Sequence, residues 1–214
     1  IHNCEQGGII GRMGAVFSII EDNHIHHINN MQELGGAEIA GIKLHAAIDA
    51  AGTIGAKIVS TFAGALEGQS VEAAMPRFRT VFGELASHAE AAGVKLAIEN
   101  CPMSGDWRHP TCNIGFNPKA WEMMFDAVPS PALGLEWEPA HQMCQLIDPV
   151  ANLRQYVGRV YHLHGKDASI HWDAIARAGI LGAVNFVDSR FPGFGDTDWR
   201  KIFAILQENG YDGA

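Results

Sequence analysis

Short apolar segments rich in β-branched residues alternate with longer segments of helical periodicity along this chain. The four clearest strand candidates begin at positions 57, 95, 132 and 159, so successive starts are 38, 37 and 27 residues apart. Each interval has room for one helix and two loops, which is the size of a βαβ crossover. The predicted strands are 57–62 (KIVSTF), 95–100 (KLAIEN), 132–137 (ALGLEW) and 159–164 (RVYHLH), with a weaker one at 15–20 (AVFSII).

The segments between the strands carry the signals of helix starts and ends. Ser70 is a favourable N-cap residue, and apolar positions at a 3.6-residue period lead from it to a terminating Gly93. Pro76 falls inside this span, so we expect the regular helix to begin near Met75. Further helices are predicted within 37–55, after the capping pair Asn117-Pro118, and from 196–198 to Gly210.

The strict alternation of strands and helices predicts an α/β fold with a parallel sheet, either doubly wound or closed as a barrel. Neither the GxGxxG nor the GxxxxGK[ST] pattern follows a predicted strand, so the nucleotide-binding doubly wound folds lack their main signal. No low-complexity linker or run of like charges divides the chain. We therefore expect residues 1–214 to form a single domain.

The composition narrows the range of partners. The chain has 15 Lys and Arg against 24 Asp and Glu, a formal net charge of −9, and the basic residues form no cluster, which disfavours a nucleic-acid partner. No apolar run is long enough to cross a bilayer, and the first residues do not resemble a signal peptide. We therefore expect no membrane partner and a cytoplasmic location, where the four scattered cysteines would remain reduced.

Polar residues close three successive predicted strands, and in a parallel barrel the strand carboxyl ends carry the active site. These residues are Glu99, Glu138 and His164. Two carboxylates and one imidazole form most of a divalent-cation site. The set favours Mn²⁺ or Mg²⁺, with Co²⁺ or Zn²⁺ as alternatives, and the lack of a Cys at these strand ends argues against a thiolate zinc site.

The alternation of side chains along a strand chooses among neighbouring residues. Glu136 and Glu138 point to the same side, and so do His162 and His164. Glu136 lies one pleat deeper, where burying a carboxylate is costly unless it is paired. Glu138 and His164 are therefore the preferred ligands, and Trp137, which alternates away from them, is expected to pack against helices.

At these residues the chain resembles the xylose-isomerase-like superfamily of TIM-barrel sugar-phosphate isomerases and epimerases. The segment 96–100 (LAIEN) is similar to the strand that brings the first metal-binding Glu of that family. The segment 134–141 (GLEWEPAH) resembles a family segment Gly-Leu-Asn-hydrophobic-Asp-Pro-Ser-His. Three further motifs match in the same order over a resemblance that spans about 37–214: 162–167 (HLHGKD), 192–199 (PGFGDTDW) and 210–213 (GYDG).

The resemblance implies that Glu99, Glu138 and His164 hold one divalent metal and that Glu99 is also the catalytic acid/base. Glu138 stands where the family usually has Asp, which is one methylene shorter. The fourth ligand of the family is a Glu on the strand after Gly-Tyr-x-Gly, beyond the last residue, Ala214. We therefore expect an incomplete TIM (β/α)8-type barrel that contains about strands two to seven. Such a fragment would have little isomerase activity of its own.

The resemblance also implies substrate contacts from Asn100, His141 and Lys166. Of these, His141 would hydrogen-bond a substrate oxygen, and Lys166 would bind a hydroxyl or a phosphate. Lys166 has a second interpretation, as a solvated loop lysine paired with Asp167.

The reaction implied is isomerisation or epimerisation of a sugar or sugar phosphate, through removal of a proton α to a carbonyl. A dehydratase on the same metal scaffold, similar to inosose dehydratase, is the alternative, because elimination of water also begins with loss of an α proton. A non-catalytic barrel is a third interpretation. An endonuclease-IV-like nuclease would need a richer set of His and Asp ligands and a basic face. The expected partner is a small sugar or polyol, and a homo-oligomer is left open.

Overall fold

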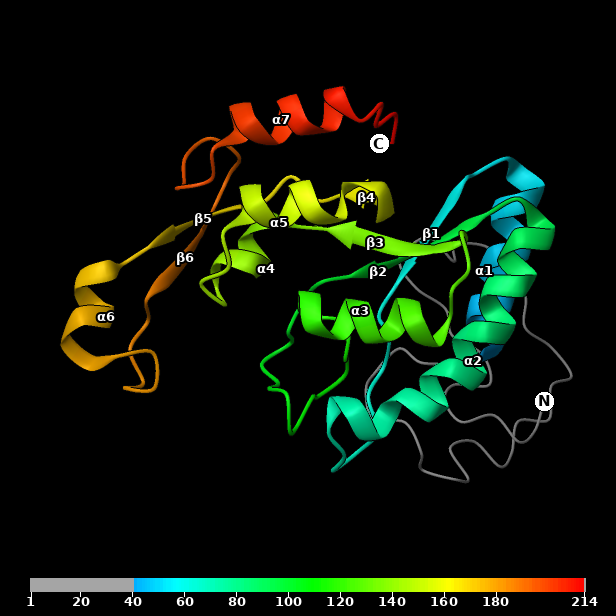
Figure 1. The fold of residues 1–214 in the computed structure, drawn as a ribbon, viewed down its shortest axis with the longest axis horizontal. Coiled ribbons are helices and arrows are strands. Elements are labelled where there is room, and N and C mark those ends of the chain that lie inside the picture. The colour runs from blue at the N-terminus through cyan, green and yellow to red at the C-terminus, as the bar shows by residue number, and fades with distance from the viewer. Residues whose placement is uncertain (1–40, 214) are drawn as a thin grey trace, which may run out of the picture.

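The computed structural model describes residues 41–213, and its centre is a curved sheet of four parallel strands in the order β1-β2-β3-β4 (Figure 1). Each strand is hydrogen-bonded to the next one along the chain, as in a (β/α) barrel, and the four together make half of such a barrel. All four predicted strands are confirmed to within one residue at each end, whereas the predicted strand 15–20 lies outside the described residues. The strands are β1 (Ile58–Thr61), β2 (Lys95–Glu99), β3 (Leu133–Trp137) and β4 (Val160–Leu163).

Helices connect the strands and cover one face of the sheet (Figure 1). None of the helices in the described part of the chain combines the length and the apolar character needed to cross a bilayer. The helices are α1 (Gly41–Ile54), α2 (Val71–Ala92), α3 (Pro118–Ala127), α4 (Pro139–Met143), α5 (Pro149–Tyr156), α6 (Trp172–Ala178) and α7 (Trp199–Glu208), with a 3₁₀ turn η1 (Val157–Arg159) before β4.

Helix α2 begins where its cap predicts, and the expected start near Met75 is wrong. The Ser70 side chain accepts a hydrogen bond from the Ala73 N–H, and the regular helix runs from Val71 through Pro76 to a left-handed Gly93 with φ 67°. The cap and the burial of the first turn against the core hold the turn that precedes Pro76, even though the proline lacks an N–H.

The other predicted helix starts are confirmed. The Asn117 side chain accepts a hydrogen bond from the Ala120 N–H at the start of α3, with Pro118 in the first turn. The Asp198 side chain accepts one from the Lys201 N–H at the start of α7. These caps fix the positions at which the chain turns from the strand ends into the covering helices.

The core lies between the sheet and the helices, and alternation sends the opposite set of side chains to the concave face. Leu96, Ile98 and Leu133 pack in one cluster with α2 and α3, while Leu135 and Trp137 pack in a second cluster with α5 and α7. The predicted packing of Trp137 is confirmed. Its neighbours on β3 therefore face the other way, toward the inside of the half-barrel.

A register shift between β3 and β4 determines which residues meet on the concave face. Leu135 pairs with Val160, but Glu136 pairs with His162, so β4 carries one extra residue at this point. An irregularity of this kind re-aims the side chains that follow it. As a result, the histidines of β4 lie beside the acidic residues of β3.

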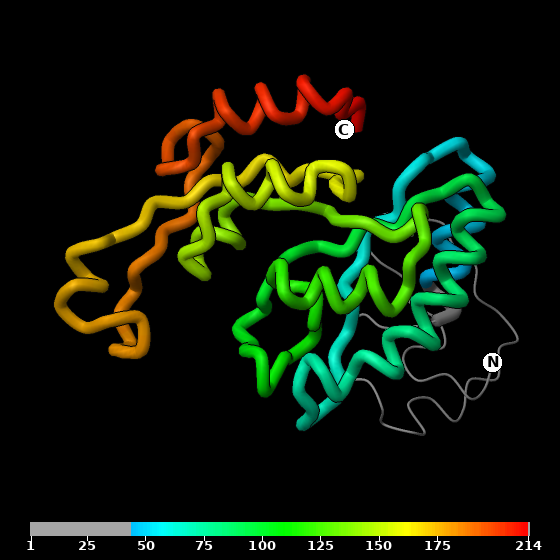
Figure 2. The backbone as a smooth tube through the Cα atoms, in the orientation of Figure 1, coloured from blue at the N-terminus to red at the C-terminus, as the bar shows by residue number. Residues whose placement is uncertain are grey.

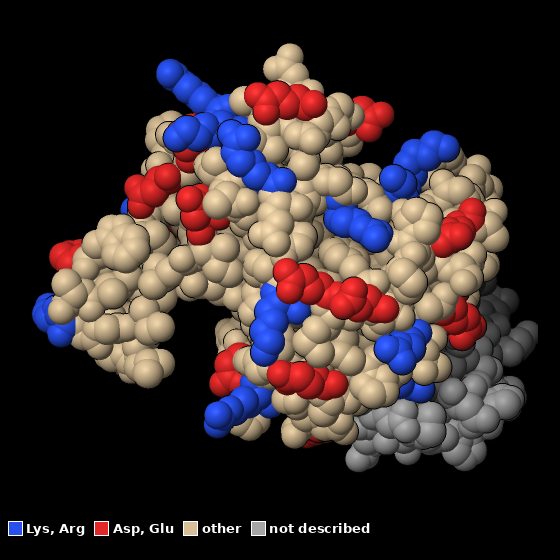
Figure 3. Space-filling view, in the orientation of Figure 1, with Lys and Arg blue, Asp and Glu red and all other residues tan. Residues whose placement is uncertain are grey.

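An arm that the sequence did not predict leaves the sheet after β4 (Figure 2). Strand β5 (Asp167–Ile170) runs outward, α6 forms the tip, and β6 (Val187–Arg190) returns antiparallel to β5. On the face drawn in Figure 3 the arm is separated from the body by a hollow, and acidic and basic side chains are interspersed. The arm and the loop that follows it expose Trp172, Ile180, Leu181, Phe191 and Phe194.

Candidate metal centre

Glu99 closes β2, and its backbone is held by Asn113, an asparagine that no pattern in the sequence singles out. Asn113 is fully buried, and its Nδ2 donates to the carbonyl oxygens of Glu99 at 2.8 Å and Cys101 at 2.9 Å. Its Oδ1 accepts from the backbone N–H groups of Ala63 and Gly115, each at 3.0 Å. Asn113 thus ties the end of β2 to the segment after β1 and to its own loop.

Glu138 follows β3 and is held by a second buried asparagine. The Asn100 Nδ2 donates to the Glu138 carbonyl oxygen at 2.9 Å, and the Asn100 Oδ1 accepts from the Glu138 N–H at 2.9 Å. This pair of bonds joins the ends of β2 and β3. The described structure uses the Asn100 amide to position Glu138, and a contact of Asn100 with substrate stays a prediction.

His164 lies just beyond β4, with its two ring nitrogens directed to different carboxylates. Its Nε2 is 2.6 Å from Oε1 of Glu136, while its Nδ1 is 3.7 Å from Oε1 of Glu99 and 3.5 Å from Oε2 of Glu138. Glu136 is therefore paired with a histidine, which offsets the cost of burying its carboxylate. Nε2 of His162 lies 3.6 Å from the same oxygen of Glu136.

The three predicted ligands come together. One potential ligand atom from each of Glu99, Glu138 and His164 lies within 4.8 Å of the other two. The Glu138 side chain is 1% exposed. Among the described residues no donor makes a hydrogen bond to Oε1 of Glu138, although cationic groups lie near it. A buried carboxylate beside a second carboxylate and an imidazole nitrogen forms a donor set that fits a divalent cation.

Two cationic side chains surround the same carboxylates. Lys166 Nζ is 3.1 Å from Oε1 of Glu138, and His141 Nε2 is 3.3 Å from that oxygen and 3.8 Å from Oε1 of Glu99. Two of the three predicted substrate residues, His141 and Lys166, therefore line the group of carboxylates.

The alternative pairing of Lys166 with Asp167 is wrong. Asp167 is fully buried and points away, toward the loop that leads into α7. Its carboxylate accepts hydrogen bonds from the backbone N–H groups of Gly193, Gly195 and Thr197 and from the Trp199 indole, at 2.9–3.1 Å. With this carboxylate fully engaged, Lys166 is left to pair with Glu138.

The charges of the group follow from these contacts. The hydrogen bond with His141 holds the pKa of Glu99 below its ordinary value, although burial opposes this. Burial raises the pKa of Glu136, and the charge of Glu99 raises it further. Burial disfavours the charged form of His141, but hydrogen bonds with Cys101, Cys144 and Glu99 and the charge of Glu138 raise its pKa to about 11. In the absence of a metal, a protonated His141 neutralises part of the acidic group.

Comparison with known proteins decides the family. The chain matches the family described as "Xylose isomerase-like TIM barrel" over residues 38–214. The chain belongs to this family. The match spans both the half-barrel and the arm, so the four parallel strands are part of a xylose isomerase-like TIM barrel.

Two curated relatives match parts of the chain. The "Uncharacterized protein YfiH" of Bacillus subtilis (strain 168) is 27% identical over 140 residues, which is 61% of this chain and 42% of that protein. The "Inosose dehydratase" of Clostridium tetani (strain Massachusetts / E88) is 34% identical over 84 residues, 37% of this chain and 28% of that protein. The matches thus cover less than half the length of these relatives.

Solved structures share the fold at low sequence identity. A xylose isomerase-like TIM barrel protein from Mycobacterium smegmatis, in complex with magnesium, superimposes with a TM-score of 0.60 at 19% identity, covering 81% of this chain and 57% of that one. An L-ribulose 3-epimerase superimposes with a TM-score of 0.56 at 19% identity, covering 81% and 52%.

Proposed function

We propose that this protein is a divalent-metal-dependent isomerase or epimerase of a sugar or sugar phosphate, with residues 1–214 acting within a single domain. The observation that carries the proposal is the convergence of Glu99, Glu138 and His164, one potential ligand atom of each lying within 4.8 Å of the other two. Mn²⁺ or Mg²⁺ is the favoured ion, because the donors are two carboxylates and one imidazole.

A neighbouring carboxylate, that of Glu136, holds the proposed ligand His164 in place. In the proposed arrangement Nδ1 of His164 faces the ion and its Nε2 bonds Glu136, which fixes the ring. Asn100 holds the Glu138 backbone in the same way on β3. These contacts would place the ligands before the ion arrives, so little ordering would accompany binding.

When bound, the cation would stabilise the negative charge that develops on substrate oxygens as the α proton leaves. Glu99 is the proposed base: its carboxylate takes the proton from the carbon next to the carbonyl. In an isomerase the proton is returned to the neighbouring carbon, and in an epimerase it is returned to the same carbon from the opposite face. Lys166 and His141 are proposed to bind and orient substrate hydroxyl or phosphate oxygens from their places beside Glu138.

A dehydratase is the second candidate function. It is supported by the 34% identity with the Inosose dehydratase of Clostridium tetani. The same Glu99 would remove the α proton, and a hydroxyl group on the next carbon would leave as water after taking a proton. His141 Nε2 lies 3.3 Å from Glu138 and 3.8 Å from Glu99, between the two carboxylates, and His141 is the proposed donor.

Metal binding tests the first part of the proposal. Purified protein is titrated with Mn²⁺, and binding is followed by calorimetry in the wild type, in Glu138→Gln and in Glu208→Gln. Glu208 is an exposed residue at the end of α7 and serves as the matched control. We expect the Glu138 variant to lose binding and the control to retain it. Equal binding by both variants would remove Glu138 from the site.

Hydrogen exchange tests the chemistry. Ketopentoses, ketohexoses and a cyclic inosose are incubated in D₂O with the Mn²⁺-loaded protein, and NMR follows deuterium entry at the α carbon and loss of water. We expect Glu99→Gln to slow exchange by about 10²–10⁴-fold. Exchange that leads to a rearranged sugar supports an isomerase or epimerase, and formation of an unsaturated ketone supports the dehydratase. No exchange with any of these substrates, in protein that binds Mn²⁺, would favour a non-catalytic barrel.

A further inference from the structure

A cysteine lies beside Glu99 and His141, although the sequence argued against a thiolate site. One potential ligand atom from each of Glu99, Cys101 and His141 lies within 4.8 Å of the other two. Cys101 is a free thiol and is partly buried. Cys101 lies two residues beyond Glu99, the last residue of β2, and is therefore not itself a strand-end residue.

Hydrogen bonds to the backbone hold these three residues in place from two sides of the group. Asn113 donates to the carbonyl oxygens of both Glu99 and Cys101, which fixes the backbone between them. The carbonyl oxygen of His141 accepts hydrogen bonds from Gln145 Nε2 at 2.8 Å and from Cys144 Sγ at 3.3 Å. The sulfur and the imidazole are therefore presented by two elements whose positions do not depend on a ligand.

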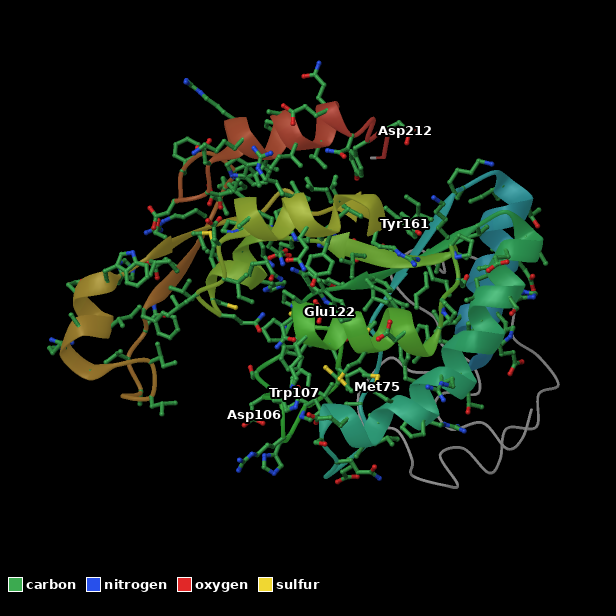
Figure 4. All side chains as sticks on the ribbon, in the orientation of Figure 1. Met75, Asp106, Trp107, Glu122, Tyr161 and Asp212 are labelled. Atoms are coloured by element: carbon green, nitrogen blue, oxygen red, sulfur yellow. The ribbon has the colours of Figure 1, made fainter. Side chains whose placement is uncertain are left out.

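The loop that follows Cys101 is anchored as well. In Figure 4 Asp106 and Trp107 lie on this loop, beneath the helix α3 that carries Glu122. The Trp107 indole donates a hydrogen bond to Glu72 on α2, and the Lys119 Nζ lies 3.8 Å from the centre of the Trp107 ring. An anchored loop keeps Cys101 at the strand end, where its sulfur can meet an ion together with Glu99.

We propose that Glu99, Cys101 and His141 form a second metal site, one that takes a thiophilic divalent cation such as Zn²⁺ or Cd²⁺. A thiolate, an imidazole and a carboxylate form a donor set suited to Zn²⁺, whereas Mg²⁺ and Mn²⁺ prefer oxygen donors. The thiol would lose its proton when the ion binds. The site goes beyond the proposed function and shares only Glu99 with the Glu99–Glu138–His164 group.

The other described cysteines are the natural controls. Cys144 Sγ donates to a backbone carbonyl, and Cys112 Sγ lies 4.0 Å from the Thr111 hydroxyl oxygen. Neither belongs to a group of three possible ligand atoms among the described residues, although Cys144 also forms a hydrogen bond with the His141 side chain. Both are free, partly buried cysteines like Cys101, so serine variants of all three form a matched set.

The test is a titration of reduced protein with Cd²⁺, followed through the ultraviolet charge-transfer absorption of a thiolate–metal bond. Cys4 lies outside the described residues, so every variant carries Cys4→Ser. We expect the absorption to saturate at one equivalent, to be lost in Cys101→Ser and to persist in Cys112→Ser and Cys144→Ser. Absorption that survives in Cys101→Ser, or that is lost only in one of the controls, would overturn the proposal.

A second measurement covers the case in which Cys101→Ser does not fold. Zn²⁺ should protect Cys101 of the otherwise unaltered chain from alkylation by iodoacetamide, as read by mass spectrometry, and should leave Cys112 and Cys144 reactive at their metal-free rates. Equal alkylation of Cys101 with and without Zn²⁺ contradicts the site. The variant Glu138→Gln separates this inference from the proposed function, because it should lose Mn²⁺ binding and retain the Cd²⁺ absorption.

Discussion

Nε2 of His164 lies 2.6 Å from Oε1 of Glu136, so the deepest carboxylate on the concave face of the sheet orients the histidine nearest the mouth. The contact depends on the register shift between β3 and β4, which sets the histidines of β4 beside Glu136. Because Glu136 holds Nε2 of His164, the direction in which Nδ1 of the same ring points is also set.

Glu136→Gln tests this relationship. The amide keeps the shape of the side chain but loses its charge, so the His164 ring is held less firmly. We expect the affinity for Mn²⁺ to fall by about 10–100-fold, as is usual for residues that orient metal-bound histidines. Calorimetric titration beside Glu208→Gln measures the change. An affinity equal to that of the control would mean that Glu136 does not orient the ligand.

Asn100→Ala should destabilise the protein. Asn100 is fully buried, and its loss leaves the N–H and the carbonyl of Glu138 without their partners. Each buried polar group left unsatisfied costs about 1–3 kcal/mol, so we expect the free energy of unfolding to fall by about 2–5 kcal/mol. Urea unfolding measures it, with the exposed Asn185→Ala as control. A change no larger than in the control would show that water or a rearranged backbone replaces the Asn100 amide.

Asp167→Asn should reduce both the stability and its dependence on acid pH. Burial raises the pKa of Asp167, but hydrogen bonds from Thr197, Trp199 and Ala168 outweigh this and hold it below its ordinary value of 3.8. A lowered folded-state pKa stabilises the fold above the unfolded-state pKa, and this stabilisation is lost as the pH falls through the folded-state pKa.

The variant lacks this titration, so its free energy of unfolding should be lower at pH 7 and should decline less steeply below about pH 4. Urea unfolding between pH 7 and the acid range measures both effects. Asp173→Asn, an exposed change on α6, is the control. Parallel pH profiles for the wild type and Asp167→Asn would exclude a lowered pKa for this carboxyl.

Gly134→Ala should be strongly destabilising, because Gly134 makes room for Tyr161. An added Cβ would lie 2.3 Å from the Tyr161 ring and 2.4 Å from the Arg159 carbonyl oxygen, and the second of these is backbone. Overpacking of this kind costs about 1–3 kcal/mol and sometimes more. Gly158→Ala is the matched control, since its Cβ would meet nothing within 4 Å. Thermal unfolding compares the two, and equal melting temperatures would contradict the close approach.

The sequence predicted the half-barrel because its strands are short and apolar and because the intervals between them carry helix signals, such as the caps at Ser70 and Asn117. The proposed metal-ligand residues followed from the rule that the carboxyl ends of parallel strands meet at one end of the barrel. Three features could not be predicted. The strands of the arm are four residues each, and DASI alternates too briefly, and VDSR has too few apolar residues, to give a strand signal. Asn113 is a single polar residue in a loop, and its role depends on partners up to 50 residues away. The position of Cys101 beside His141 depends on the path of two loops.

The arm also bears on how new substrate preferences arise on this scaffold. Its two strands form a ladder that ends at the pair Ile170–Val187, and the Asp167 carboxylate fastens the base of the arm to the loop before α7. Residues 171–186 can therefore be shortened to a hairpin turn or exchanged for another segment while the ladder retains its register. A library randomised in this segment would vary the arm while the proposed metal site on the sheet stays unchanged, and would test whether the arm contributes to recognition separately from the proposed chemistry.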